Sequence, residues 1–298
     1  MTARDNAPEI GSILAYVDGG PGSESVIKTA TKIGTVYKAH VEVLHIAKSV
    51  GSVLPPMDVG GSLVAATEIF EIMKNESEAR ANKAKSVFDQ FCQTEKIERV
   101  DPDSNETLLH QELTVSWNLL TGSDGRDLAR RGRLFDLIVM ARATDQIGGV
   151  DSVQLEAALF DSGRPVLIAG EQLETLCSTA VVIAWDGSRE AAHSVTLALP
   201  LLAKASQVHI ISVGTREPGL GIEDFGRYLA RHGISVENCQ LPKSSKSIAH
   251  ALVDASLEKK AGMLVMGAYG HSSLGESLFG GVTREMLEEG KIPLLMAH

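Results

Sequence analysis

The feature that most constrains the fold is a pattern that occurs twice along the chain. A short apolar run ends in an aspartate followed by a glycine, and a segment with helical spacing of apolar residues comes next. The first copy covers residues 12–34 and contains Asp18, and the second begins at residue 180 and contains Asp186. Such runs are typical of a buried strand followed by a helix. The sequence therefore predicts a tandem repeat of one strand–turn–helix unit.

The same alternation continues through both halves. We expect strands in the first half at residues 12–17, 41–46, 113–117, 136–141 and 164–169, and counterparts in the second at residues 180–186, 208–213, 234–241, 264–267 and 293–297. Strands that alternate with helices imply right-handed crossovers and a mostly parallel sheet. The predicted fold class is α/β, with two tandem five-stranded parallel-sheet open domains at residues 1–172 and 178–298.

The first half is longer than the second between its first and fourth strands. A stretch rich in Glu, Ala and Lys at residues 62–91, which predicts one or two helices, follows a loop around Pro55 and Pro56. We expect this helical insertion to account for the extra length.

Composition narrows the function classes. The 298 residues are 44% hydrophobic but only 4% aromatic, which fits an aliphatic α/β core, and the formal net charge is −10. This charge disfavours nucleic-acid and anionic-membrane partners. The polar start at residues 1–8 and the absence of a long apolar run lead us to expect a cytoplasmic protein. Three widely separated cysteines, Cys92, Cys177 and Cys239, indicate neither a disulfide framework nor a metal site.

A glycine-rich segment follows the fourth strand of the second half. Gly267 and Gly270 are separated by two residues, and Gly280 follows nine residues later, where a helical pattern begins. Glycines let backbone N–H groups approach an anion, and a helix N-terminus carries partial positive charge. The segment therefore predicts a phosphate loop, although it has no Walker lysine. The alternative is that the glycines only shape turns and cap the helix.

Several polar residues accompany this loop. Asp18 and Asp186 each follow a first strand, at the sheet edge where open α/β sheets bind ligands. Aspartate before glycine is also good turn chemistry, which we favour for Asp18, whereas both roles are compatible for Asp186. His271 lies in the loop and either contacts phosphate or faces solvent. The hydroxyl of Thr283 would add one donor near the helix start.

At these residues the sequence resembles the universal stress protein (UspA-like) family in its tandem two-domain form. Nucleotide-binding members carry an aspartate after the first strand and a G-x2-G-x9-G-[Ser/Thr] loop after the fourth. Their domains have a five-stranded, Rossmann-like parallel sheet of the adenine nucleotide alpha hydrolase type. The resemblance covers nearly the whole chain and is strongest over residues 180–213 and 262–298.

The resemblance implies that the second half binds ATP or AMP, with or without Mg²⁺. The implied contact residues are Ala184, Trp185 and Asp186 at the adenine, the backbone of Val213 at the base, Met266 and Gly267 at the ribose, and Gly270, Gly280, Gly281, Val282 and Thr283 at the phosphates, with His271 completing the candidate set.

Two departures from the family pattern matter. Gly281 stands where the family has Ser or Thr, so one hydroxyl contact to phosphate is missing and weaker binding is expected. The first half has Ala141, Arg142, Ala143 and Thr144 where the two glycines should be. We therefore expect that the first half has lost its nucleotide loop and serves as a packing partner.

The predicted function is that of a stress-response regulatory protein that binds an adenine nucleotide and has no catalytic residue. No general base or Walker lysine is evident to support rapid phosphoryl transfer. One alternative is a slow ATPase or self-phosphorylating protein with Thr283, Ser272, Ser273 or Ser277 as acceptor, and another is a nucleotide-free scaffold. The resemblance also implies that the halves pair through residues 165–169 and 293–297, and that two chains form a homodimer.

Overall fold

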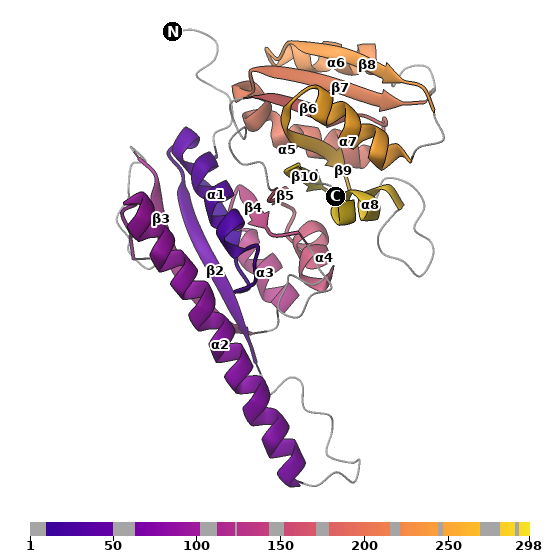
Figure 1. Ribbon diagram of the computed structural model, residues 1–298. Helices are drawn as coiled ribbons and strands as arrows, with labels where there is room; N and C mark the ends of the chain where they lie inside the picture. The colour runs from indigo at the N-terminus through magenta and orange to yellow at the C-terminus, as the bar shows by residue number, and fades with distance from the viewer. Residues whose placement is uncertain are drawn as a thin grey trace.

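The computed structural model describes residues 10–49, 63–101, 112–122, 124–142, 152–170, 179–214, 221–243, 247–268, 281–289 and 292–298. Within these residues ten strands form one sheet in the order β3-β2-β1-β4-β5-β10-β9-β6-β7-β8, with helices packed on both sides (Figure 1). Residues 171–178, at the predicted boundary between the two domains, and the loop at Pro55 and Pro56 lie outside the described residues. The α/β class is confirmed.

Within the described residues, the first half comprises five parallel strands and four helices. The strands are β1 (Ser12–Tyr16), β2 (His40–Lys48), β3 (Thr114–Gly122), β4 (Leu137–Met140) and β5 (Val166–Ile168), and the helices are α1 (Ser23–Tyr37), α2 (Leu63–Glu95), α3 (Asp124–Gly132) and α4 (Ser152–Asp161). Strand β3 is longer than the predicted 113–117, because its partly exposed second portion continues to pair with β2 as far as Gly122. An edge strand of this kind has no continuous apolar run to mark its end.

The second half repeats this arrangement. Its strands are β6 (Ala180–Ala184), β7 (Gln207–Val213), β8 (Val236–Leu241), β9 (Ala261–Gly267) and β10 (Leu294–Ala297), and its helices are α5 (Arg189–Lys204), α6 (Ile222–Arg231), α7 (Ile248–Glu258) and α8 (Gly281–Glu289). In both halves the third, second, first, fourth and fifth strands are neighbours in that order. The duplication read from the sequence is therefore a duplication of topology.

The two halves join through their last strands. β5 and β10 are antiparallel, and Leu294 pairs with Ile168, Leu295 with Leu167 and Met296 with Val166. All six side chains are buried, and residues of both halves belong to one continuous apolar core. The predicted pairing of the last strands is confirmed.

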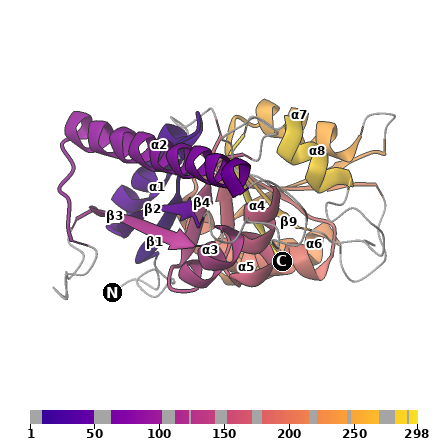
Figure 2. The same ribbon diagram turned by 90° about the horizontal axis from the view of Figure 1, so that it is seen from below.

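The insertion in the first half is a single long helix, α2. Figure 1 shows one end of α2 extending well past the strands, and Figure 2 shows α1 and α2 on one side of the first-half strands and α3 on the other. The C-terminal part of α2 packs on the sheet through Ala84 and Phe88, whose ring lies 5.6 Å from that of Trp117. No helix in the described part of the chain, α2 included, is both long and apolar enough to cross a membrane.

Arg142 connects the two halves by hydrogen bonds. It follows β4, at the position where the first half lacks a loop glycine, and its guanidinium reaches the end of α8. Nη1 donates to the carbonyl oxygens of Met286 (2.7 Å) and Leu287 (3.0 Å), and Nη2 donates to that of Ile292 (3.2 Å). A cation is favourable at a helix C-terminus, where carbonyl groups lack intrahelical partners. A residue that departs from the nucleotide-loop pattern thus fastens α8 to the first half.

We expect Arg142→Ala to lower the free energy of unfolding by about 2 kcal/mol, because three carbonyl groups lose a charged donor. Urea denaturation of the purified protein measures this change. Arg142→Lys is the matched control: it keeps the charge but not the planar fork, so its stability should lie between the two. An Ala variant with the same midpoint and slope as the parent protein would contradict this role.

Candidate nucleotide site in the second half

Three of the predicted contact regions lie at one edge of the sheet. β6 pairs in parallel with β7 on one side and with β9 on the other. Asp186 comes two residues after β6, Val213 is the last residue of β7, and Gly267 is the last residue of β9. Because the strands are parallel, their carboxyl ends meet at the same edge, where open α/β sheets hold ligands.

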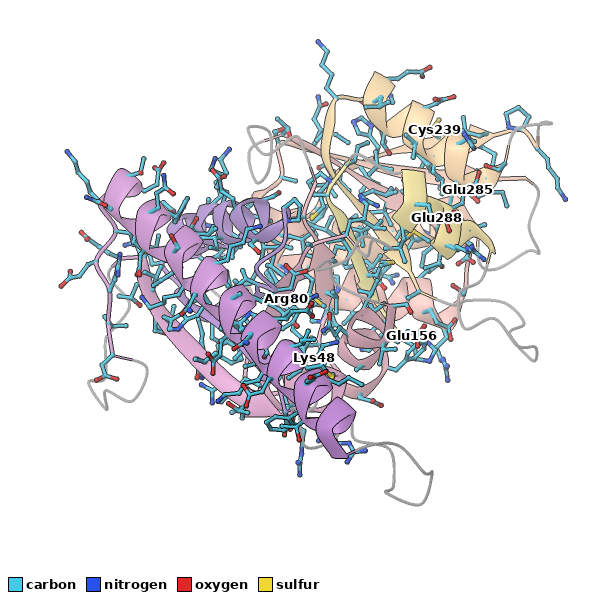
Figure 3. All side chains as sticks on the ribbon, turned by 60° about the horizontal axis from the view of Figure 1, so that its bottom comes forward. Lys48, Arg80, Glu156, Cys239, Glu285 and Glu288 are labelled. Atoms are coloured by element: carbon cyan, nitrogen blue, oxygen red, sulfur yellow. The ribbon has the colours of Figure 1, made fainter. Side chains whose placement is uncertain are left out.

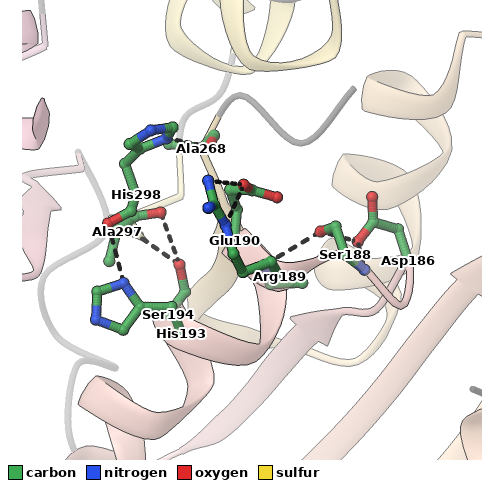
Figure 4. Close-up of polar contacts among 10 residues, drawn as sticks. Asp186, Ser188, Arg189, Glu190, His193, Ser194, Ala268, Ala297 and His298 are labelled. Carbon is green, nitrogen blue, oxygen red and sulfur yellow. Dashed lines mark hydrogen bonds and ion pairs between the residues drawn. The ribbon is translucent and has the colours of Figure 1, made fainter. Parts of the chain in front are cut away.

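Asp186 is fixed by a turn. Its Oδ1 accepts hydrogen bonds from the backbone N of Ser188 (2.9 Å) and from the Ser188 hydroxyl. Ser188 in turn caps α5, because its Oγ accepts a hydrogen bond from the backbone N of Ala191 at 3.1 Å (Figure 4). Gly187 between them has φ +75°, a conformation that glycine adopts without strain. Both roles expected for Asp186, as a turn residue and at the ligand edge, are therefore compatible with its position.

Trp185 is buried in an aromatic stack. Its exposed fraction is 8%, and its ring lies parallel to that of Phe225 in α6, with centroids 3.8 Å apart and an interplanar angle of 3°. Phe225 also lies 6.1 Å from Tyr228, one helical turn further on. Sequence reasoning missed Phe225, although the spacing of two aromatic residues on one helical face was a usable signal. The stack closes the side of the edge that faces α6.

The neighbouring predicted residues differ in what they can offer a ligand. Ala184 and Val213 are half-buried at the ends of β6 and β7, whereas the side chain of Met266 is buried in the core. Met266 can therefore meet a ligand only through its backbone. Among the described residues, no group of three or more His, Cys, Asp or Glu side chains is arranged to hold a metal ion.

Gly267 is required by packing. A Cβ atom at this position would lie 2.5 Å from the backbone N of Ala191 and 2.7 Å from the carbonyl carbon of Glu190. The end of β9 therefore touches the first turn of α5 directly, and both contacting atoms belong to the backbone. This glycine has a structural function besides its predicted place at the ribose.

The first half has the same close contact between a strand end and a helix start, but there the glycine belongs to the helix start. There Gly22 stands before α1, and a Cβ atom on it would lie 2.6 Å from the Cβ of Ala141, the residue after β4. The glycine is thus on the helix side in the first half and on the strand side in the second. The missing glycine at position 141 is therefore matched by one at position 22.

The start of α8 is the predicted phosphate-binding element. Since β9 and β10 are parallel, α8 runs back between them, and its N-terminus lies at the carboxyl end of β9. Gly281 is exposed, and a Cβ atom there would have no neighbour within 4 Å. Thr283 is only 4% exposed, so its side chain does not face solvent. This helix start can offer backbone N–H groups, because the first four of a helix lack intrahelical partners.

Three groups of predicted residues lie outside the part of the chain that the structure describes. They are the loop glycines Gly270 and Gly280, His271, and the alternative phosphate acceptors Ser272, Ser273 and Ser277.

A carboxylate already lies at the start of α5. Glu190 is buried in the first turn of that helix, and its Oε1 accepts from Nε of Arg189 at 3.0 Å (Figure 4). Burial raises the pKa of Glu190, but hydrogen bonds from its own backbone and from Arg189 outweigh burial and lower that pKa below its ordinary value. Glu190 is therefore negative at neutral pH and favourably placed at a helix N-terminus. Phosphate groups would be repelled here, which leaves α8 as the better anion site.

His298 at the C-terminus contacts residues next to this edge of the sheet. The carbonyl oxygen of His298 lies 2.9 Å from Nδ1 of His193 in α5, and Nδ1 of His298 lies 3.3 Å from the carbonyl oxygen of Ala268 (Figure 4). The His298 ring also meets Phe160 of α4 edge to face, with centroids 4.6 Å apart. The end of the chain thus links α5, the residue after β9, and the first half.

We expect Gly267→Ala to lower the free energy of unfolding by about 1–3 kcal/mol, because its methyl group would overlap backbone atoms that cannot rotate away. Thermal and urea unfolding measure the loss. Gly281→Ala is the matched control, since a methyl group there meets open space. Equal stability of both variants would show that β9 and α5 are not in direct contact.

Comparison with known proteins gives one curated relative. No family model matches the sequence. The chain is 27% identical over 173 residues to a universal stress protein from Synechocystis sp., and the match covers 54% of this chain and 57% of that protein. The chain thus matches little more than half the length of this relative.

Solved structures match over nearly the whole chain. A universal stress protein from Archaeoglobus fulgidus superposes with a TM-score of 0.62 at 15% identity, covering 96% of this chain and 97% of that one. A putative universal stress protein from Pseudomonas aeruginosa gives 0.56 at 15% identity, covering 97% and 93%. At such identities these matches concern the fold. Together with the curated relative, they confirm the predicted resemblance of this chain to the universal stress protein family in its tandem two-domain form.

Proposed function

We propose that the second half binds ATP or AMP, with or without Mg²⁺, and that the protein acts as a stress-response regulator. The observation that carries the proposal is the convergence of Asp186, Val213 and Gly267 at one sheet edge, with the exposed start of α8 at the same edge. These are the elements that the family resemblance assigns to the nucleotide.

In the proposed site the base and ribose lie at the ends of β6 and β7, and the phosphates lie at the start of α8. Asp186 would accept hydrogen bonds from ribose hydroxyls or the adenine amino group, and Val213 would meet the base through its backbone. The N–H groups at the start of α8 would hold the phosphates, helped by the helix dipole. The negative charges of Asp186 and Glu190 favour this orientation, because they repel phosphate from the α5 side.

The buried side chain of Thr283 bears on the alternative of self-phosphorylation. A hydroxyl that is almost fully enclosed is a poor phosphate acceptor, so this alternative rests on the loop serines. Two measurements separate the proposal from its two alternatives: identification by chromatography of any nucleotide released from the denatured protein, and incubation of the purified protein with nucleotide. Retained ATP or AMP supports the proposal, accumulation of ADP or of phosphoprotein in ATP–Mg²⁺ favours the slow enzyme, and the absence of any measurable nucleotide affinity favours the scaffold.

We expect Asp186→Asn to weaken ATP or AMP binding roughly ten- to a hundredfold, because hydrogen bonds to a charged acceptor are replaced by weaker ones. Asparagine keeps an oxygen for the Ser188 turn, so the fold should survive. Isothermal titration calorimetry gives the affinity. Asp18→Asn, the same change at the corresponding place of the first half, is the matched control and should leave nucleotide affinity unchanged.

Gly281→Ser restores the hydroxyl that the family pattern has at this position. We expect about tenfold tighter nucleotide binding, since a hydrogen bond to a charged phosphate contributes about 1.5 kcal/mol. Gly281→Ala gains at least as much helix propensity but adds no hydroxyl, so tighter binding by the serine variant alone isolates the contact. If both variants bind nucleotide like the parent protein, phosphate does not lie at this helix start.

A further inference from the structure

The first half contains a cavity that the nucleotide proposal does not use. It has a volume of about 240 Å³ and lies at the carboxyl ends of β1 and β2, under α2. Asp18 and Lys48 line it from the strand ends, Met73, Glu76 and Arg80 from α2, and Gln154 from α4. The cavity therefore depends on the insertion that distinguishes the first half.

Helix α2 is held tightly against the strand edge that it covers. Gly19, the residue after Asp18, has φ +80°, and a Cβ atom on it would lie 2.6 Å from the carbonyl oxygen of Arg80. The backbone of α2 thus rests directly on the turn that follows β1. In the second half the helix between the second and third strands is the ten-residue α6, where the first half has the 33-residue α2. Within the described residues, the second half therefore has only a much shorter helix where α2 forms a wall in the first.

Two cations face this cavity. Lys48 and Arg80, which are labelled close to one another in Figure 3, both line the cavity. Within the described residues Arg80 forms no ion pair or hydrogen bond, although it is only partly exposed. A half-buried guanidinium of this kind offers a forked donor for a carboxylate.

Two carboxylates face the same cavity. Asp18 is only 8% exposed, and its Oδ1 accepts from the backbone N of Gly20 (2.7 Å) and from Oγ of Ser23 (3.3 Å). Its Oδ2 has no donor among the described residues. Glu76 lies on α2, one turn before Arg80, and is exposed at the rim. A buried carboxylate with an unfilled acceptor favours a ligand that brings a donor.

The volume of the cavity and the charges that line it indicate which class of ligand would fit. An engineered cavity of about 150 Å³ holds benzene, so this one has room for about ten non-hydrogen atoms, fewer than a nucleotide contains. A purely anionic ligand would leave Asp18 uncompensated, and a purely cationic one would be repelled by Arg80 and Lys48. The two carboxylates and two cations together match a molecule with one charge of each sign.

We propose that this cavity binds a small zwitterion of the free α-amino acid class. Arg80 and Lys48 hold the carboxylate of the ligand, Asp18 and Glu76 accept hydrogen bonds from its ammonium group, and Met73 contacts its side chain. The first half is then a second sensory site, for a ligand class different from that of the second half.

Titration of the full-length protein with each of the common L-α-amino acids, one at a time by calorimetry, tests the proposal. At least one should bind saturably, and its N-acetyl and methyl-ester derivatives, which each lack one charge, should bind about tenfold more weakly or worse. Absence of binding by every amino acid would overturn the proposal. Binding of inorganic phosphate or AMP in this cavity instead would also overturn it.

Variants locate the ligand. Arg80→Met keeps an unbranched apolar stem and removes the charged guanidinium group, and it should weaken amino-acid binding about tenfold or more. Arg126→Met, the same change at an exposed position of α3 that does not line the cavity, is the matched control and should bind normally. Asp18→Asn should also weaken amino-acid binding. If that variant disturbs folding, Glu76→Gln at the exposed rim supplies the second test. Unchanged affinity in both Arg80→Met and Glu76→Gln would contradict the site.

Discussion

The antiparallel pairing of β5 with β10 is the interaction on which the rest of the structure depends. Each half alone would end its sheet in a short, wholly apolar strand, and such an edge is a liability in water. Pairing the two edges buries both and merges two sheets into one core. Across the same boundary Arg142 then adds hydrogen bonds, and His298 adds an edge-to-face ring contact with Phe160. The halves therefore share one structure, although each has its own carboxyl edge of parallel strands.

The carboxyl edges of the two halves differ, although the halves share a core. The second half keeps a short helix, α6, beside its edge, together with an exposed glycine at the start of α8. The first half has replaced the loop glycines, uses Arg142 to fasten α8, and covers its edge with α2. One duplicated topology thus presents two edges with different charges and different walls. The two edges of a tandem chain can differ in this way, because a separate stretch of sequence encodes each of them.

The sequence was a good guide wherever periodicity or backbone geometry decides the outcome. The alternation of apolar runs and helical patterns predicted the order of strands, and the family resemblance predicted the pairing of the last ones. It was a poor guide to contacts between distant side chains. The spacing of Phe225 and Tyr228 marks one face of α6, but nothing in the pattern places that face on Trp185, because the contact depends on how α6 packs over β7 and β8. Gly267 lies between these two cases. The sequence indicated the glycine, but only the structure shows its close approach to α5, because that approach depends on how two elements pack.

Joining β5 to β10 also limits how two copies of this protein can associate. Within the described residues the sheet ends at β3 on one side and β8 on the other, and both strands have several exposed positions. The last strands, which the halves use to recognise one another, are at the centre of the sheet and already paired on both sides. A second copy therefore has to meet this one through its outer strands, its helices or its loops, and so by a surface different from the one that joins the two halves.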